Sequence, residues 1–127
     1  MAQSRPKRIL IVDDDEDVRI LFRATLPPDA YEVAEAATIS EAWDRLSDSH
    51  VDLIVLDIGL PDGNGLDLCQ VIRQDHRLGA LPIIILTGDS SATGHIQGYQ
   101  KGADRYVAKP YRPSEMLETI RYLIAHS

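Results

Sequence analysis

The sequence predicts an α/β fold, in which a parallel sheet carries helices on both faces. Three short apolar runs, residues 9–12, 53–56 and 83–86, do not alternate apolar with polar residues and are rich in β-branched side chains. Such runs are typical of strands that are buried on both faces of a sheet. Helical patterns lie between the runs, and this alternation implies parallel strands joined by right-handed crossovers.

The first helix and a weaker strand follow the first run. Apolar residues recur at helical spacing from Val18 to Leu26, and Pro27 and Pro28 end the pattern. Residues 31–36 are then predicted to form the second strand, although their apolar character is weaker than that of the three runs.

Two helices with the same spacing are predicted in the middle of the chain. Thr38 can cap the first of them, and Glu41, three residues on, would complete a capping box. This helix is expected to bury Ile39, Ala42, Trp43 and Leu46. The next is expected to bury Leu68, Cys69 and Ile72, with Leu66 and Val71 beside them. The segment PDGNG, residues 61–65, predicts a turn before it.

The C-terminal part completes five repeats of strand and helix. The stretch 90–102 is the weakest helix prediction, because Gly94 and Gly98 each cost about 1 kcal/mol relative to Ala in a helix interior. Residues 105–108 are a second weak strand. The last helix begins near Pro113, and its apolar stripe consists of Met116, Leu117, Ile120, Leu123 and Ile124.

Length, composition and charge exclude several classes of protein and favour a single globular domain. A chain of 127 residues, 44% of them hydrophobic, is predicted to form one globular domain over residues 1–127. The single Cys69 excludes an internal disulfide and a cysteine metal cluster. The net charge of −7 argues against direct binding of nucleic acid or of an anionic membrane surface. No apolar run approaches the roughly 20 residues of a membrane helix, so a cytoplasmic protein is expected.

Polar residues follow four of the predicted strands. Asp13 and Asp14 follow the first, Asp57 the third, Thr87 the fourth and Lys109 the fifth. Functional sites of open α/β sheets lie at the carboxyl ends of the strands. The sequence therefore predicts that three acids, a hydroxyl and an ammonium group meet at one edge of the sheet.

This set of side chains suits phosphoryl transfer to a carboxylate. Clustered carboxylates raise one another's pKa unless a cation lies between them, and Mg²⁺ prefers such oxygen ligands together with waters and a phosphate. Asp57 is the predicted nucleophile, which would form an aspartyl phosphate. Lys109 and Thr87 are available to stabilise the phosphoryl oxygens. The following acids, residues 15–17, are interpreted as the N-terminus of the first helix.

Four segments together resemble the receiver domain of two-component response regulators, over almost the whole chain. They are ILIVDDDEDVR (residues 9–19), DLIVLDIGLPDGNGLDLC (52–69), PIIILTG (82–88) and GADRYVAKPYRPSEML (102–117). The resemblance implies that Asp57 accepts a phosphoryl group from the phosphohistidine of a histidine kinase. It also implies that Asp14 and Asp57 bind Mg²⁺ directly and that Asp13 acts mainly through water. The backbone carbonyl of Gly59 would complete the protein ligands.

The same resemblance implies a flavodoxin-like (βα)5 three-layer sandwich with strand order 2-1-3-4-5. Thr87 and Tyr106 would be the switch pair, and Lys109 would bind phosphate after a cis peptide bond to Pro110. The signal would leave through the face of the fourth helix, fifth strand and fifth helix. Expected partners are a sensor histidine kinase or phosphotransfer protein, a downstream effector and, on phosphorylation, a second copy of the chain.

Two other functions remain as alternatives. One is a receiver-like interaction domain that takes no phosphate, although the full set of site residues argues against it. The other is a phosphatase of the haloacid-dehalogenase kind, which also forms an aspartyl phosphate. That class places a second acid two residues after its nucleophile, and here Gly59 stands at that position after Asp57.

Overall fold

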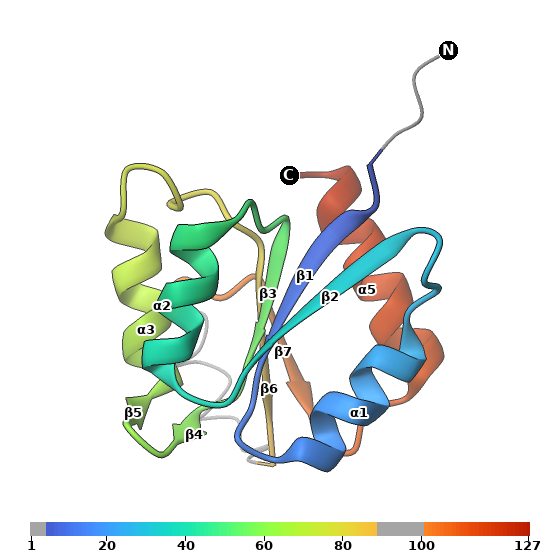
Figure 1. Ribbon diagram of the computed structural model, residues 1–127, viewed down its shortest axis with the longest axis horizontal. Helices are drawn as coiled ribbons and strands as arrows, with labels where there is room; N and C mark the ends of the chain where they lie inside the picture. Colours follow the sequence, from blue (N-terminus) through green and yellow to red (C-terminus); the bar gives the residue numbers. More distant parts are fainter. Residues whose placement is uncertain (1–4, 89–100) are drawn as a thin grey trace.

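A computed structural model describes residues 5–88 and 101–127 of the chain. Its main feature is a parallel sheet of five strands in the order β2-β1-β3-β6-β7 (Figure 1). In that order the strands are Tyr31–Ala36, Lys7–Val12, Leu53–Leu56, Ile83–Thr87 and Arg105–Ala108. Because β6 and β7 are the fourth and fifth strands of this sheet, the predicted order 2-1-3-4-5 is confirmed.

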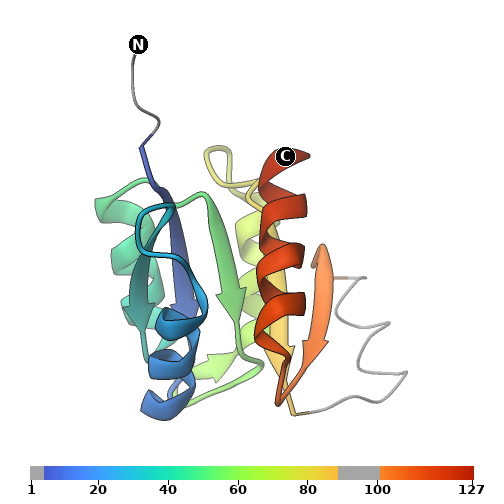
Figure 2. The ribbon, with the colours of Figure 1, turned by 90° about the vertical axis from the view of Figure 1, so that its right-hand side faces the viewer.

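Helices cover both faces of the sheet and make three layers. They are α1 (Glu16–Thr25), α2 (Ile39–Asp48), α3 (Gly65–Gln74) and α5 (Pro113–Ala125). Figure 1 shows α2 and α3 on one face and α1 and α5 on the other, and Figure 2 shows α1 and α5 from the side that they cover. The helix predicted over 90–102 falls on residues outside the described part, except Lys101 and Gly102, which lie in a turn.

Two hydrophobic cores, one on each face, explain the unbroken apolar runs. Along β1, Leu10 and Val12 pack into the core under α2 and α3, whereas Ile9 and Ile11 pack into the core under α1 and α5. Successive side chains of a strand point to opposite faces, so a strand covered on both sides needs apolar residues at every position. Phe22 of α1 is fully buried in the second core.

The helix starts follow the predicted capping chemistry with one difference. The Asp15 carboxylate accepts a hydrogen bond from the amide of Asp17 at 2.9 Å, and the Thr38 hydroxyl accepts one from the amide of Glu41 at 3.0 Å. The Glu41 carboxylate, however, accepts from the amide of Ala37 at 3.1 Å and not from Thr38. The predicted capping box thus closes one residue early, because the carboxylate reaches past the N-cap.

The segment before α3 is a small hairpin where only a turn was predicted. Its strands are β4 (Gly59–Leu60) and β5 (Gly63–Asn64), which pair antiparallel. Asp62 at its tip accepts hydrogen bonds from the amides of Ile39 and Ser40 at the start of α2, and these bonds lower the pKa of its carboxyl group. The hairpin is therefore fastened to the neighbouring helix.

Helix α3 is amphipathic as predicted at all but one of the named positions. Leu66, Leu68, Cys69 and Ile72 are buried, but Val71, predicted to lie beside them, is 49% exposed. Burial raises the pKa of the Cys69 thiol to about 11. A thiol that stays protonated at neutral pH is a core residue and not a reactive one, as the sequence indicated.

Candidate functional site

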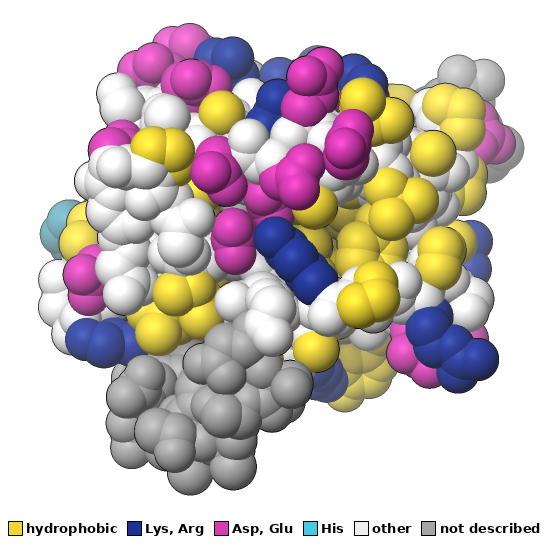
Figure 3. Space-filling model, turned by 90° about the horizontal axis from the view of Figure 1, so that it is seen from below, with side chains coloured by type: hydrophobic (Ala, Val, Ile, Leu, Met, Phe, Trp, Pro, Cys, Tyr) yellow, Lys and Arg dark blue, Asp and Glu magenta, His cyan; other side chains and the backbone are white. Residues whose placement is uncertain are grey.

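The carboxyl ends of four strands bring the predicted site residues together. The amide of Asp57 donates to the carbonyl of Val12 at 2.9 Å, which places the residues after β3 and β1 side by side. The amide of Lys109 donates to the carbonyl of Thr87 at 2.8 Å and joins β7 to β6 in the same way. Figure 3, which looks onto this end of the molecule, shows acidic side chains gathered here next to a hydrophobic area.

Three carboxylates form the centre of the site. Asp13, Asp14 and Asp57 each offer an oxygen, and these oxygens all lie within 4.8 Å of one another. Asp13 is fully buried and Asp57 is 8% exposed, whereas Asp14 is open to solvent. The cluster is thus closed on the side of the sheet and open on the side from which a ligand would enter.

Lys109 is the cation that faces the acids. Its Nζ lies 2.7 Å from Oδ2 of Asp13 and 3.5 Å from Oδ2 of Asp57. Burial disfavours the charged ammonium, but the hydrogen bonds and charges of Asp13 and Asp57 outweigh it and raise the pKa of Lys109. Lys109 is therefore charged at neutral pH. The predicted cis peptide bond between Lys109 and Pro110 is confirmed.

The Asp57 carboxyl lies in an environment that disfavours its negative charge. Burial and the neighbouring charge of Asp13 raise its pKa above 3.8, and Lys109 only partly offsets them. A carboxylate held this way favours a further cation beside it. The site thus has the electrostatics predicted for a place where Mg²⁺ binds between acids.

Thr87 and Tyr106 are buried on neighbouring strands. Each is 7% exposed, and β6 and β7 pair Thr87 with Ala108 and Ile85 with Tyr106. By the two-residue period of a strand, Thr87 points to the same face of the sheet as Ile85. Ile85 and Tyr106 both belong to the core under α2 and α3. The two residues predicted to form a switch therefore face the same core.

From the sequence, Gly65 is predicted only as part of a turn. Its amide donates to the carbonyl of Ile58 at 2.7 Å, so α3 begins directly against the loop that carries Asp57. A Cβ atom at Gly65 would lie 2.0 Å from the backbone oxygen of Asp57. Only glycine permits this close approach. Gly59, the predicted backbone ligand, lies two residues after Asp57 and is exposed.

Comparison with known proteins decides the family. A model of the response regulator receiver domain matches residues 9–121. The chain belongs to the response regulator receiver domain family. The transcriptional regulatory protein GltR of Pseudomonas aeruginosa is 36% identical to this receiver over 118 residues, which are 93% of this chain and 49% of GltR. The regulatory protein VanR of Enterococcus faecium is 40% identical over 114 residues, which are 90% of this chain and 48% of VanR.

Solved structures agree with the assignment. A putative response regulator from Chloroflexus aurantiacus superposes with a TM-score of 0.90 at 34% identity, covering 95% of this receiver and 99% of that chain. A CheY-like receiver domain protein from Methanospirillum hungatei gives a TM-score of 0.87 at 32% identity, covering 96% of both chains. The receiver spans about half the length of the curated relatives it matches.

Membership of the family gives the general function. Receiver domains of two-component response regulators switch on phosphorylation, bind Mg²⁺ at an acidic pocket and interact with histidine kinases. Within the described part of this receiver, no helix is both long and apolar enough to cross a membrane.

Proposed function

We propose that Asp57 is the phosphorylated residue of this receiver and that its donor is the phosphohistidine of a histidine kinase or phosphotransfer protein. The observation that carries the proposal is the position of the Asp57 carboxylate. It ends a buried strand, lies within 4.8 Å of oxygens of Asp13 and Asp14, and has the Lys109 ammonium 3.5 Å away. Asp13 lies in the same cluster and closer to Lys109, but its side chain is fully buried, whereas that of Asp57 is 11% exposed and can meet a donor.

The step itself is a displacement at phosphorus. An Oδ of Asp57 attacks the phosphorus atom and forms the P–O bond of an acyl phosphate. The P–N bond to the donor imidazole breaks, and the ring nitrogen keeps the electron pair and takes up a proton. Water attack on the same phosphorus returns the carboxylate and inorganic phosphate. We propose that the receiver promotes both steps on itself, which makes it a signalling protein and not an enzyme that turns over other substrates.

The acids fit Mg²⁺ by their chemistry. Asp14 and Asp57 would bind the ion directly, Asp13 would act through water, and the backbone carbonyl of Gly59 would be a further ligand. All are hard oxygen donors, and the oxygens of the three carboxylates lie within 4.8 Å of one another. Burial and the neighbouring charge of Asp13 raise the pKa of Asp57. When bound, Mg²⁺ supplies positive charge opposite the phosphoryl oxygens.

Lys109 and Thr87 would hold the phosphoryl group once it is attached. The Lys109 ammonium is charged and already lies between Asp13 and Asp57, so it can turn toward a phosphoryl oxygen without crossing the site. The Thr87 hydroxyl, at the end of β6, would donate to another. Because Tyr106 faces the same core as Thr87, movement of Thr87 would alter the packing of Tyr106 and hence the surface formed by β7 and α5.

An apolar surface beside the acids suits the donor protein. Val18, Leu21, Pro110 and Tyr111 line a shallow cavity of about 310 Å³ next to Lys109, and Leu21 is 46% exposed. A phosphohistidine brought to Asp57 would place its carrier against this surface. We propose a cytoplasmic kinase or phosphotransfer protein as that carrier, and residues 1–127 as one receiver domain.

Asp14→Ala tests the metal part of the proposal. The substitution removes a solvent-facing ligand, so we expect Mg²⁺ affinity to fall about tenfold or more and labelling by acetyl phosphate to be lost with it. Asp17→Ala is the matched control, because it removes a nearby exposed acid of α1 that is not part of the cluster. Calorimetric Mg²⁺ titration and phosphoprotein electrophoresis measure the two effects. Full-rate labelling of the wild type in EDTA would show the metal role to be wrong.

The same reagents separate the alternative functions. Incubation with a small acyl phosphate and Mg²⁺ should give stoichiometric labelling. Fast continuous release of phosphate without labelling would indicate a phosphatase, and the absence of both reactions would indicate an interaction domain that takes no phosphate.

A further inference from the structure

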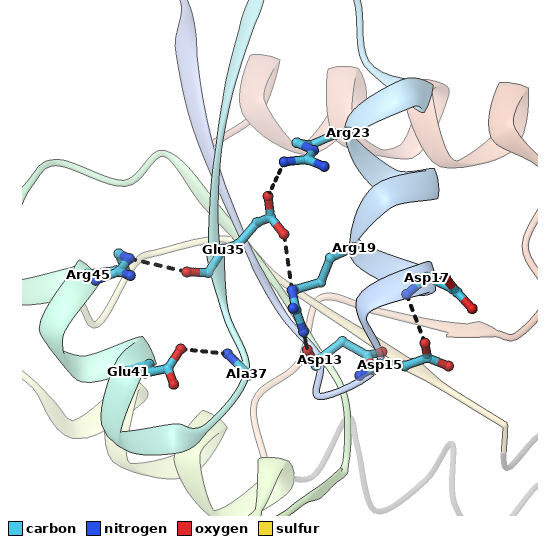
Figure 4. A network of polar contacts seen from close by, with 9 residues as sticks. All are labelled: Asp13, Asp15, Asp17, Arg19, Arg23, Glu35, Ala37, Glu41 and Arg45. Atoms are coloured by element: carbon cyan, nitrogen blue, oxygen red, sulfur yellow. Dashed lines mark hydrogen bonds and ion pairs between the residues drawn. The ribbon is translucent and has the colours of Figure 1, made fainter.

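Arg19 connects the acid loop to the edge of the sheet. This residue lies near the start of α1, and its guanidinium donates in two directions (Figure 4). Its Nη1 donates to the backbone carbonyl of Asp13 at 2.7 Å, and its Nε donates to Oε1 of Glu35 on β2 at 3.0 Å. The Arg19 side chain is only 17% exposed, so most of its surface packs against the protein.

The carbonyl that Arg19 contacts belongs to the most enclosed residue of the site. Asp13 is fully buried, and its backbone groups and Oδ1 are hydrogen-bonded, whereas its Oδ2 has only an ion pair. Its amide donates to the carbonyl of Ala36, its Oδ1 accepts from the amide of Asp15 at 2.9 Å, and its Oδ2 lies 2.7 Å from Nζ of Lys109. Arg19 completes this set at the carbonyl, where a lost donor would leave a buried acceptor unsatisfied.

Glu35 holds the Arg19 guanidinium in turn. Its carboxylate accepts from Arg19 with one oxygen and from Nη1 of Arg23 with the other, at 2.7 Å. Its own backbone carbonyl accepts from Nε of Arg45 on α2 at 3.1 Å (Figure 4). Glu35 is therefore fixed from both sides of the sheet, and Arg19 has a rigid support.

We propose that Arg19 is a positioning residue for the acid cluster, acting on the peptide bond between Asp13 and Asp14. The carbonyl that it holds lies in the plane of this peptide, so the hydrogen bond sets the direction in which the chain enters Asp14. Asp14 is the exposed member of the cluster and has no burial to orient it. The inference rests on the proposed function, in which the Asp14 carboxylate binds Mg²⁺ directly.

The two acceptors explain why arginine stands here. A guanidinium presents several donors in a fixed planar fork, so one side chain can reach a carboxylate and a carbonyl in different directions at once. A lysine ammonium at the same position keeps the charge but has a single nitrogen to share between Glu35 and Asp13. Arginine and lysine therefore distinguish positioning from a simple effect of positive charge.

Three variants test the assignment with Mn²⁺ as the probe, free Mn²⁺ being counted by electron paramagnetic resonance. Arg19→Met keeps the apolar stem and removes all donors, and we expect about tenfold weaker Mn²⁺ binding. Arg19→Lys should bind Mn²⁺ with an affinity between that variant and the wild type. Arg23→Met is the matched control: it lies on the same helix and contacts the same Glu35, but it is half-exposed and does not touch Asp13. Its affinity should equal that of the wild type.

Glu35→Gln is a second test that leaves Arg19 in place and weakens the carboxylate contacts of residue 35 with Arg19 and Arg23. We expect a smaller loss of affinity in the same direction, with the thermal midpoint of each variant recorded in the absence of metal. Equal affinity of Arg19→Met and Arg23→Met would overturn the proposal, and so would wild-type affinity in Arg19→Lys, because charge alone would then suffice. Failure of the wild type itself to bind Mn²⁺ would instead refute the proposed function on which the inference rests.

Discussion

Asp57→Asn is expected to abolish phosphoryl labelling of the receiver by acetyl phosphate and Mg²⁺. The amide has the shape of the carboxylate but no anionic oxygen to attack phosphorus. Of the neighbouring acids, Asp13 is paired with Lys109, and Asp14 is the proposed Mg²⁺ ligand. The measurement is incorporation of radioactive phosphate at saturating donor. Labelling of the variant at the wild-type level would show that another residue is the acceptor.

The same variant should be folded, and its stability carries a pH signature. The pKa of Asp57 is raised above 3.8 in the folded state, chiefly by burial and by Asp13, so ionising this carboxyl opposes folding. The contribution of the protonated carboxyl is complete below pH 3.8 and is lost as the pH rises through the folded pKa. Asn is neutral throughout. Asp57→Asn should therefore melt above the wild type at pH 7, with a difference that shrinks toward pH 3.8.

Gly65→Ala is expected to have the largest effect on stability of any single methyl group added to the site. The new Cβ would lie 2.0 Å from the backbone oxygen of Asp57, so either α3 or the Asp57 loop must move. Overpacking of this kind costs about 1–3 kcal/mol, and contact with backbone leaves no flexible side chain to give way. We expect a loss of about 3 kcal/mol in the free energy of unfolding, measured by urea denaturation, and slower phosphorylation of Asp57.

Gly88→Ala is the matched control for that substitution. Gly88 directly follows Thr87, and a Cβ atom there meets nothing within 4 Å. Its unfolding midpoint should stay at the wild-type value. If the two variants unfold at the same urea concentration, the contact between α3 and the Asp57 loop is not as tight as the structure has it.

The strands and helices that the sequence predicted best are those whose burial produces a recognisable pattern of apolar residues. Residues 53–56 are apolar at every position because both faces of β3 are covered, and the Met116 to Ile124 stripe marks the buried face of α5. The acids, Thr87 and Lys109 were predicted to converge because parallel strands share one carboxyl edge. The structure confirms that convergence; the roles of these side chains stay predictions.

Other features could not be predicted from the sequence because they depend on tertiary contacts. They involve residue types, such as arginine, that occur both at the surface and in buried hydrogen-bond networks. No pattern in the sequence marks a role for Arg19 or Arg73, yet Arg19 holds the Asp13 carbonyl. Arg73 donates to the carbonyls of Gly102, Gly79 and Leu81 and pairs with Asp104. The sequence does not indicate which arginines donate hydrogen bonds to backbone carbonyls in the folded protein.

The close approach of Gly65 to the Asp57 backbone could not be predicted for a similar reason. Gly65 stands in a glycine-rich segment that already predicts a turn, and the carbonyl it must accommodate is eight positions earlier in the chain. The capping box of α2 also shows the limit of a local pattern, since the Glu41 carboxylate accepts from the amide of Ala37 and not from that of Thr38.

Mapping the acyl phosphate on the wild-type receiver tests the account most directly. After acetyl phosphate and Mg²⁺, borohydride reduces an aspartyl phosphate to homoserine, and peptide mass spectrometry locates it. We expect homoserine at position 57 alone, and none when EDTA replaces Mg²⁺. Homoserine at position 13 or 14, or at position 57 in the presence of EDTA, would contradict the assignment of Asp57 as a metal-dependent phosphoryl acceptor.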